Sequence, residues 1–313
     1  MALSGLFLRP YRPASILLFM EKRDPGYLSK KTMKTKWIWI GLCLFSLLSC
    51  NERIQPPEKN EPVFAAMDEE MRSNPLPFDS TARSIHVFVA LCDNRYQGIV
   101  PVPAAIGNGQ DPANNLYWGC GFGIKTFFKR SKEWVLVKTQ KPESVRLERL
   151  VFKHRIKNVY LIADAWDGAR IQECTVDFLK SSAGQLKDTI MADGRAIGIA
   201  GNAQLIAYIG HNGLMDFQLT QGYPSADDLR RDVIILACYS KNYFSPLMEQ
   251  ANANPLVWTT GLMAPEAYTL HDAITGYVNN ESAENIRTRA ALAYARYQQC
   301  SERAARNLLV TGW

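Results

Sequence analysis

Two short apolar runs, "LIAYIGHNGLMDF" (205–217) and "DVIILACYS" (232–240), decide how the chain folds. The first passes from apolar residues into His211, and the second ends in Cys238. Continuous Ile, Leu and Val without polar alternation is typical of strands that are buried on both faces of a parallel sheet. The segment between the runs is long enough for one crossover. We therefore expect neighbouring parallel strands, with the histidine and the cysteine at the same edge of the sheet.

The same patterns extend outward from these two strands. Further apolar runs predict strands at 85–93, 133–139, 158–166 and 256–261. Helices are expected at the end of 114–130, over 143–155, 169–182, 264–278 and 282–298, and near 225–231 in the crossover. The helix over 143–155 is predicted from Leu147, Leu150, Val151 and His154, which would share one face, and Ser282 is a good N-cap for the last helix. Strands alternating with helices predict an α/β fold, with a mainly parallel sheet covered by helices on both faces.

Cys238 and His211 together suggest nucleophilic chemistry. A cysteine attacks as its thiolate, and a nearby imidazole favours that state. Asp216 lies five residues after His211 and could orient the imidazole ring. The simplest reaction for such a pair is acyl transfer such as amide hydrolysis, which needs neither a metal nor another cofactor.

The two strand ends also resemble those of the caspase-like fold, which caspases, legumains, gingipains and bacterial CHAT domains share. In that group one strand ends in His-Gly, and the next core strand ends in Ala-Cys or Ser-Cys; the matching segments here are "LIAYIGHNG" and "VIILACYS". The segments 85–94, 158–182 and 254–278 are similar to the other core elements, so the resemblance covers roughly 84–280, with strand 133–139 as an addition. It implies a three-layer sandwich in which Cys238 is the nucleophile and His211 the general base or acid.

The sequence departs from that group directly after the histidine. The family has Gly at this position, whereas this chain reads His211-Asn212-Gly213. The resemblance then implies that the backbone amide of Asn212 lines the oxyanion hole, with Gly213 displaced by one residue.

A long segment after the first strand, from Asp93 to Gly121, is rich in Asn, Gly, Pro and aromatic residues. Loops of this length often carry function, so we expect a substrate or ligand surface here, with Asp93, Asn94, Asn115 and Trp118 as candidates. An ordered surface loop is the alternative. The included "GCGFGIKT" lacks the GxxxxGK[ST] spacing of a phosphate-binding loop.

Two other functions stay open from the sequence. Cys238 could be a small buried hydrophobic residue, as cysteines at strand ends often are, and the domain would then be a module that binds a peptide or glycan without cleaving it. Alternatively, Asp164 and Asp167 lie at the end of the strand 158–166 and could hold a metal ion for a hydrolase, although Asp167 could equally cap the next helix.

The start of the chain is predicted to be a targeting segment. "MKTKWIWIGLCLFSLLSC" (33–50) has two lysines, a dozen apolar residues and then Ser49-Cys50. It resembles a bacterial lipoprotein signal peptide, which implies that Met33 is the true start and that Cys50 carries lipid. We expect a leader over 1–49, a lipidated cysteine and tether over 50–83, and one α/β domain over 84–313. The domain would be anchored to a lipid bilayer of the bacterial cell envelope, facing the periplasm or the exterior.

Removing the leader changes the charge of the protein. Eight of its 36 basic residues and two of its 30 acidic residues lie in 1–49, so 28 of each remain and the formal net charge is zero. A neutral chain gives no electrostatic reason to expect nucleic acid as a partner. Five cysteines remain after Cys50, and this odd number leaves at least one thiol unpaired within the chain.

Overall fold

The computed structural model describes residues 78–313 apart from 143–144, and its central element is an eight-stranded sheet. The strands are β1 (Arg83–Ala90), β2 (Trp134–Gln140), β3 (Arg146–His154), β4 (Val159–Trp166), β7 (Leu205–Gly210), β8 (Asp232–Leu236), β9 (Asn254–Thr259) and β10 (Leu309–Val310). Their order across the sheet is β10-β9-β8-β7-β1-β4-β3-β2. The leader, Cys50 and most of the predicted tether lie outside the described residues.

The middle of the sheet is parallel. β4, β1, β7, β8 and β9 are paired in parallel, whereas β2, β3 and β10 are added antiparallel at the two sides. The parallel strands therefore all end at one edge, which is where ligands bind in open α/β sheets. The predicted α/β fold with a mainly parallel sheet is confirmed.

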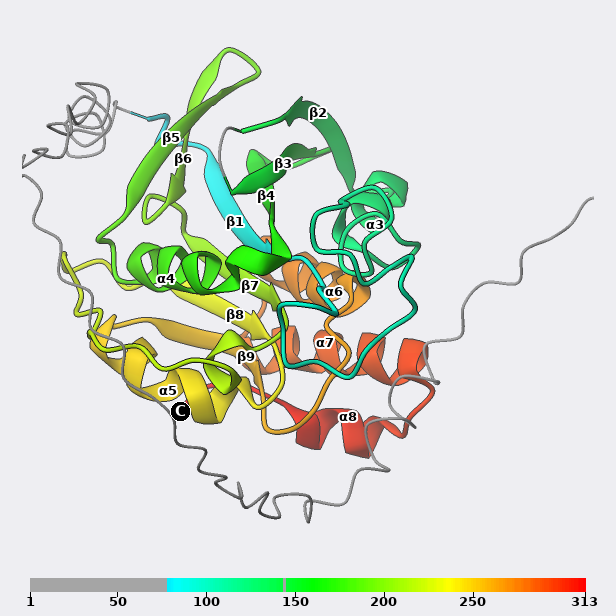
Figure 1. Cartoon of the computed structure of the whole chain (residues 1–313). Helices are drawn as coiled ribbons and strands as arrows, with labels where there is room; N and C mark the ends of the chain where they lie inside the picture. Colours follow the sequence, from blue (N-terminus) through cyan, green and yellow to red (C-terminus); the bar gives the residue numbers. More distant parts are fainter. Residues whose placement is uncertain (1–77, 143–144) are drawn as a thin grey trace, which may run out of the picture.

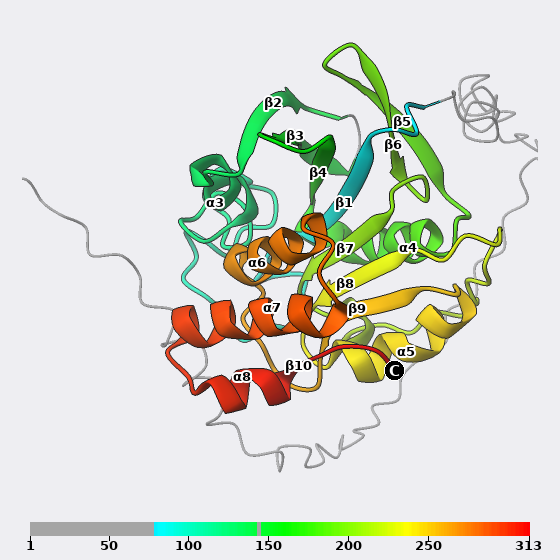
Figure 2. The same ribbon diagram turned by 180° about the vertical axis from the view of Figure 1, so that it is seen from behind.

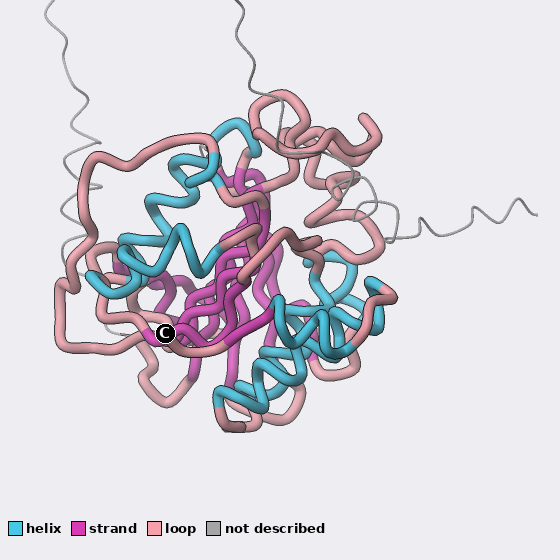
Figure 3. Tube along the Cα trace, turned by 90° about the horizontal axis from the view of Figure 1, so that it is seen from below, coloured by secondary structure: helices cyan, strands magenta, loops and turns pink. Residues whose placement is uncertain are grey.

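Helices cover both faces and complete three layers. They are α3 (Ile124–Arg130), α4 (Ile171–Ser182), α5 (Ser240–Gln250), α6 (Ala267–Val278), α7 (Ala283–Gln298) and α8 (Glu302–Leu308). Figures 1 and 2 show α4 and α5 on one face of the sheet and α6 and α7 on the other. Viewed along the layers in Figure 3, the strands lie between two groups of helices.

Side chains of β1 show why both faces need a cover. Val87 and Val89 pack into the cluster that contains α3, α6 and α7, whereas Phe88 and Ala90 pack into the cluster with α4 and α5. Successive residues of a strand point to opposite faces, so an unbroken apolar run supplies two cores at once.

A second, two-stranded sheet was not expected from the sequence. β5 (Lys187–Ala192) and β6 (Arg195–Ala200) form an antiparallel hairpin joined by Asp193 and Gly194. Both turn residues have positive φ, 49° and 71°, as a two-residue type I′ turn requires. The hairpin packs Ile190, Ile197 and Ile199 on Tyr160 and Ile162 of β4, and so covers the part of the sheet beyond α4.

Two of the predicted helices are wrong. Within 143–155 the described residues form β3, which is hydrogen-bonded to β2 on one side and to β4 on the other. The helical spacing of Leu147, Leu150 and Val151 is outweighed by this pairing.

The crossover near 225–231 contains no helix either. There the Asp227 carboxylate accepts hydrogen bonds from the Leu229 amide and the Arg231 guanidinium. Such side-chain bonds stabilise turns at the expense of a helix. The expected cap of α7 is confirmed, because Ser282 accepts a hydrogen bond from the Asn285 amide.

A buried ionic cluster joins β1, β3 and β4. Arg149 donates to both oxygens of Asp164 at 2.6 and 2.7 Å, and His86 Nε2 lies 3.1 Å from Asp164 Oδ2. The Ala200 amide donates to His86 Nδ1, so the cluster also fixes the hairpin. Burial alone would raise the pKa of Asp164, but the Arg149 guanidinium outweighs it and holds the pKa well below its usual range.

We predict that Asp164→Asn strongly destabilises the fold, because it removes the carboxylate that is hydrogen-bonded to the buried Arg149. Removing one partner of such a pair typically costs about 3–5 kcal/mol. Urea denaturation followed by circular dichroism measures the loss. The exposed Asp228→Asn is the matched control and should change the free energy of unfolding by less than about 0.5 kcal/mol. Equal stability of the two variants would contradict the role given to the cluster.

Candidate active site

The pairing of β7 with β8 aligns the two residues singled out in the sequence. Leu205 pairs with Asp232, and the same offset holds up to Ile209 and Leu236. Extended past the strand ends, this register places His211 opposite Cys238. Neighbouring strands lie about 4.8 Å apart, so the two backbones are close at this edge.

Cys238 occupies a sharp turn between a strand and a helix. β8 ends at Leu236, Tyr239 has a left-handed conformation with φ 50°, and α5 begins at Ser240. The Cys238 side chain is 8% exposed, and its sulfur lies 3.4 Å from the amide nitrogen of Met263, which donates to it. A turn of this kind presents a side chain at the tip of a strand.

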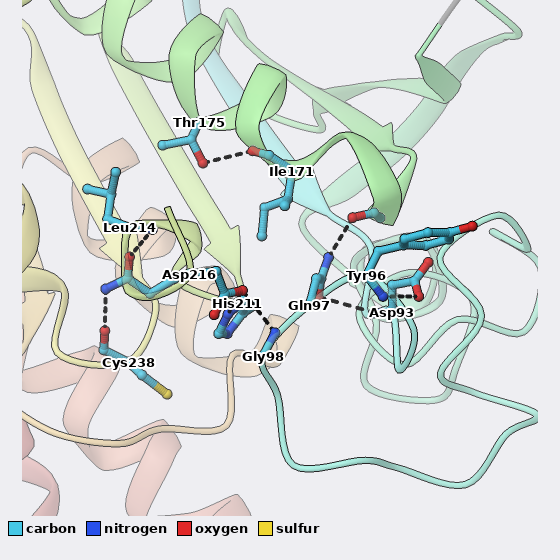
Figure 4. Close-up of polar contacts among 12 residues, drawn as sticks. Asp93, Tyr96, Gln97, Gly98, Ile171, Thr175, His211, Leu214, Asp216 and Cys238 are labelled. Carbon is cyan, nitrogen blue, oxygen red and sulfur yellow. Dashed lines mark hydrogen bonds and ion pairs between the residues drawn. The ribbon is translucent and has the colours of Figure 1, made fainter. Parts of the chain in front are cut away.

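The imidazole of His211 is held by a carboxylate (Figure 4). His211 Nε2 lies 2.7 Å from Asp216 Oδ2, and the same oxygen accepts a hydrogen bond from the Gly98 amide at 2.9 Å. A carboxylate is an acceptor, so the neutral ring carries its proton on Nε2. The other nitrogen, Nδ1, is then free to accept a proton. The expected orienting role of Asp216 thus has a direct geometric basis.

Asn212 joins the two strand ends through its side chain. It is fully buried, its Nδ2 donates to the Cys238 carbonyl at 2.7 Å, and its Oδ1 accepts from the Leu214 amide at 3.1 Å. The second bond caps the short 3-10 helix η2 (Gly213–Met215). Asn212 therefore fixes the position of Cys238 relative to His211, while Gly213 is buried against Phe217.

Two backbone amides lie at these strand ends. Within the described residues, the N–H groups of Asn212 and Cys238 donate to no backbone carbonyl, and the Cys238 amide interacts with its own thiol. Amides at such a position are suited to bind a developing oxyanion.

A cavity of about 150 Å³ opens at this edge of the sheet. His211 and Cys238 both line it, and its walls come from the segments that follow β1, β7, β8 and β9. The two side chains are not hydrogen-bonded to each other in the described structure. A substrate group can therefore enter between them, and catalytic hydrogen bonds often form only in the bound complex.

Burial keeps both groups neutral at rest. It lowers the pKa of His211, although the neighbouring Asp216 carboxylate opposes this effect. It also raises the pKa of the Cys238 thiol, against the hydrogen bond from the Met263 amide. The sequence led us to expect a thiolate favoured by the imidazole. In the structure without substrate, both pKa shifts instead favour a thiol and a neutral imidazole.

The four candidates in the long loop are bonded within the fold rather than exposed to the cavity. Asp93 accepts from the Arg95 and Tyr96 amides, and Asn94 bonds both backbone groups of Val102. Asn115 bonds the backbone of Cys92, and Trp118 donates to Glu148. The loop does reach the cavity, but through residues that the sequence did not single out: Gly98, Ile99, Val100, Val102, Leu116 and Tyr117.

The two acids considered for a metal do not form a joint site. The oxygens of Asp164 are bonded to Arg149 and His86, and Asp167 caps the 3-10 helix η1 (Gly168–Arg170) by accepting from the Ala169 amide. Among residues 78–313, apart from 143–144, no group of three or more His, Cys, Asp or Glu could hold a metal ion. The capping alternative for Asp167 is confirmed.

One acid of the cavity was missed in the sequence. Glu266 follows Pro265 in the loop between β9 and α6 and lines the cavity together with His211 and Cys238. Burial raises the pKa of Glu266 to about 7, although a hydrogen bond from Tyr268 opposes the shift. No local pattern distinguishes such a glutamate from an exposed one.

No protein-family model, curated protein or solved structure matches the chain. No helix of the described residues has the length and apolar character needed to cross a membrane.

We predict that Cys238 behaves as a high-pKa thiol in the resting protein. Because its pKa is raised, its thiolate fraction near pH 7 is smaller than that of a free thiol, and its alkylation rate should still be rising above about pH 8.5, the usual pKa of a free thiol. Iodoacetamide labelling across pH, read out by peptide mass spectrometry, measures this. The urea-unfolded protein is the control, in which Cys238 should regain an ordinary profile. A midpoint below that of the unfolded chain would contradict the prediction.

Proposed function

We propose that the chain is a cysteine peptidase or a related amidohydrolase of the caspase-like type, with Cys238 as nucleophile and His211 as general base and acid. The observation that carries the proposal is the alignment of His211 with Cys238 at adjacent parallel strand ends, on one cavity, with Asp216 bound to the imidazole. The chain order, histidine strand followed by cysteine strand, also agrees with the resemblance seen in the sequence.

The first step forms a thioester. As the Cys238 sulfur attacks the substrate carbonyl carbon, its proton passes to His211 Nδ1. Asp216 stabilises the imidazolium through Nε2–H, since these atoms are already 2.7 Å apart. His211 then donates the proton to the leaving amine, and the carbon–nitrogen bond breaks. Water attacks the thioester with His211 as base, which releases the acid and restores the thiol.

The transition state requires donors for the carbonyl oxygen. The amides of Asn212 and Cys238, which donate to no backbone carbonyl among the described residues, support this role, because the Asn212 side chain holds both backbone segments in one arrangement. Where the caspase-like family has His-Gly, this chain has a His-Asn-Gly turn that is capped by the Asn212 side chain. Such preorganised amides are commonly worth several kcal/mol in the transition state.

A binding module of the same fold is the second candidate. The observation in its favour is that Cys238 is a nearly buried thiol with a raised pKa and has no hydrogen bond to His211 in the described structure. A module of this kind would hold a peptide or glycan in the cavity without cleaving it.

The cellular location is part of the proposal. The signal-like segment that ends at Cys50 supports a lipid anchor on that residue and a position in the bacterial cell envelope, facing the periplasm or exterior. The peptide or protein substrate would then be met outside the cytoplasm.

We expect His211→Ala to lower kcat/KM by roughly 10²–10⁴, the usual contribution of a general base, and Cys238→Ala to abolish turnover. Asp216→Asn should cause a smaller loss, because it weakens only the stabilisation of the imidazolium. Cleavage of a fluorogenic peptide library measures these effects, and Asp228→Asn is the control that should keep full activity. Turnover that persists in Cys238→Ala would exclude the mechanism, and binding of library peptides without turnover would favour the second candidate.

We also expect Cys50→Ala to prevent lipidation, because the thiol is the acceptor of the lipid. Metabolic labelling of the protein in a bacterial host with an alkyne fatty acid, followed by membrane fractionation, measures this. Cys43→Ala, within the apolar run, is the matched control and should be labelled normally. Unchanged labelling of Cys50→Ala would remove the anchor from the proposal.

A further inference from the structure

The cavity contains one carboxylate that the proposed reaction does not use. Glu266 is 5% exposed, and its Oε2 accepts hydrogen bonds from Tyr268 Oη at 2.8 Å and Gln298 Nε2 at 3.2 Å. The other oxygen, Oε1, has no hydrogen-bond partner among the described residues. Glu266 Oε1 is absent from the set of fully buried polar atoms that lack a partner, so this oxygen is partly exposed. Since Glu266 lines the cavity, this oxygen is available to a bound group.

A carboxyl group buried without a counter-charge is costly and calls for an explanation. In the described part of the chain no lysine, arginine or histidine forms an ion pair with Glu266 or shifts its pKa. The two hydrogen bonds from α6 and α7 hold the side chain in place but supply no positive charge to stabilise its ionised form. A ligand that brings a positive charge would complete the site.

The position of Glu266 relative to the nucleophile suits a side-chain pocket. The Met263 amide contacts the Cys238 sulfur, and Glu266 follows three residues later, which is at most about 10 Å of chain. The cavity that both residues line is mostly apolar, and its other lining residues include Leu116, Tyr117 and Met263. Such a lining accepts the methylene stem of a long side chain whose charged end reaches the acid.

We infer that this cavity is the specificity pocket of the proposed peptidase, and that Glu266 selects a lysine side chain of the substrate next to the cleaved bond. The inference rests on the proposed function. Lysine is favoured over arginine because only one oxygen of Glu266 is free, whereas a guanidinium binds best to both oxygens of a carboxylate. A neutral side chain of equal length would gain the apolar contacts but not the ion pair.

The test compares peptidyl chloromethyl ketones that differ only in the last residue: lysine, arginine, norleucine or glutamine. The alkylation rate of Cys238 by each probe is measured by intact-mass spectrometry on the wild type, Glu266→Gln and, as a matched control, the exposed Glu249→Gln. We expect the lysine probe to react at least tenfold faster than norleucine in the wild type and in Glu249→Gln. The preference should disappear in Glu266→Gln. Equal rates in the wild type, or a preference that survives in Glu266→Gln, would overturn the inference.

A second measurement tests whether the cavity binds a cation, independently of whether Cys238 is a nucleophile. n-Butylammonium, which mimics the lysine side chain, should raise the melting temperature of the wild type more than 1-butanol or ammonium chloride does, and should not do so for Glu266→Gln. If no chloromethyl ketone labels Cys238 but n-butylammonium binds in this way, the peptidase proposal fails and the cation pocket stands. If the probes label Cys238 without a lysine preference and n-butylammonium has no effect, the peptidase proposal stands and the pocket inference is overturned.

Discussion

The parallel hydrogen bonding of β7 to β8 is the constraint on which the site depends. Parallel strands must be paired in one register along their length, because a slip would move each apolar side chain to the wrong face. Here the register is fixed by apolar residues that pack against α4 and α5 on one side and α6 and α7 on the other. The alignment of His211 with Cys238 is therefore a product of the two cores, and no contact between the two side chains is needed to maintain it.

Low polarity governs the chemistry of the cavity. The same burial lowers the pKa of His211, raises that of Cys238 and raises that of Glu266, and each shift favours the neutral form of the group. The groups that line a cavity of this kind carry little net charge. Charge would be created only when a substrate is bound and water is displaced, which is when electrostatic interactions with fixed amides and carboxylates are strongest.

The sequence predicted those parts of the fold that depend on local pattern. Unbroken apolar strands such as 204–210 and 232–238 and the Ser282 cap could be read directly. β3 could not, because Leu147, Leu150 and Val151 fit a helix, and only pairing with β2 and β4 makes the segment a strand. The Asp193-Gly194 pair is a local hairpin signal, and its two residues have the positive φ that such a turn requires. Three residues of the site could be predicted from the sequence. His211 and Cys238 follow apolar strands, and Asp216 lies only five residues after His211. Glu266 acquires its character from α6 and α7, which no local pattern reveals.

The shared oxygen of Asp216 has one further consequence. It binds the imidazole of His211 and, at the same time, the amide of Gly98 in the long loop after β1. A side chain at position 98 would collide with this carboxylate, since a Cβ there would lie 2.3 Å from Asp216 Oδ1. One carboxylate oxygen thus accepts from both donors at once and ties the long loop to the imidazole. The position of the loop backbone and the orientation of the ring are therefore set by a single side chain, and glycine is the residue that lets the two come this close.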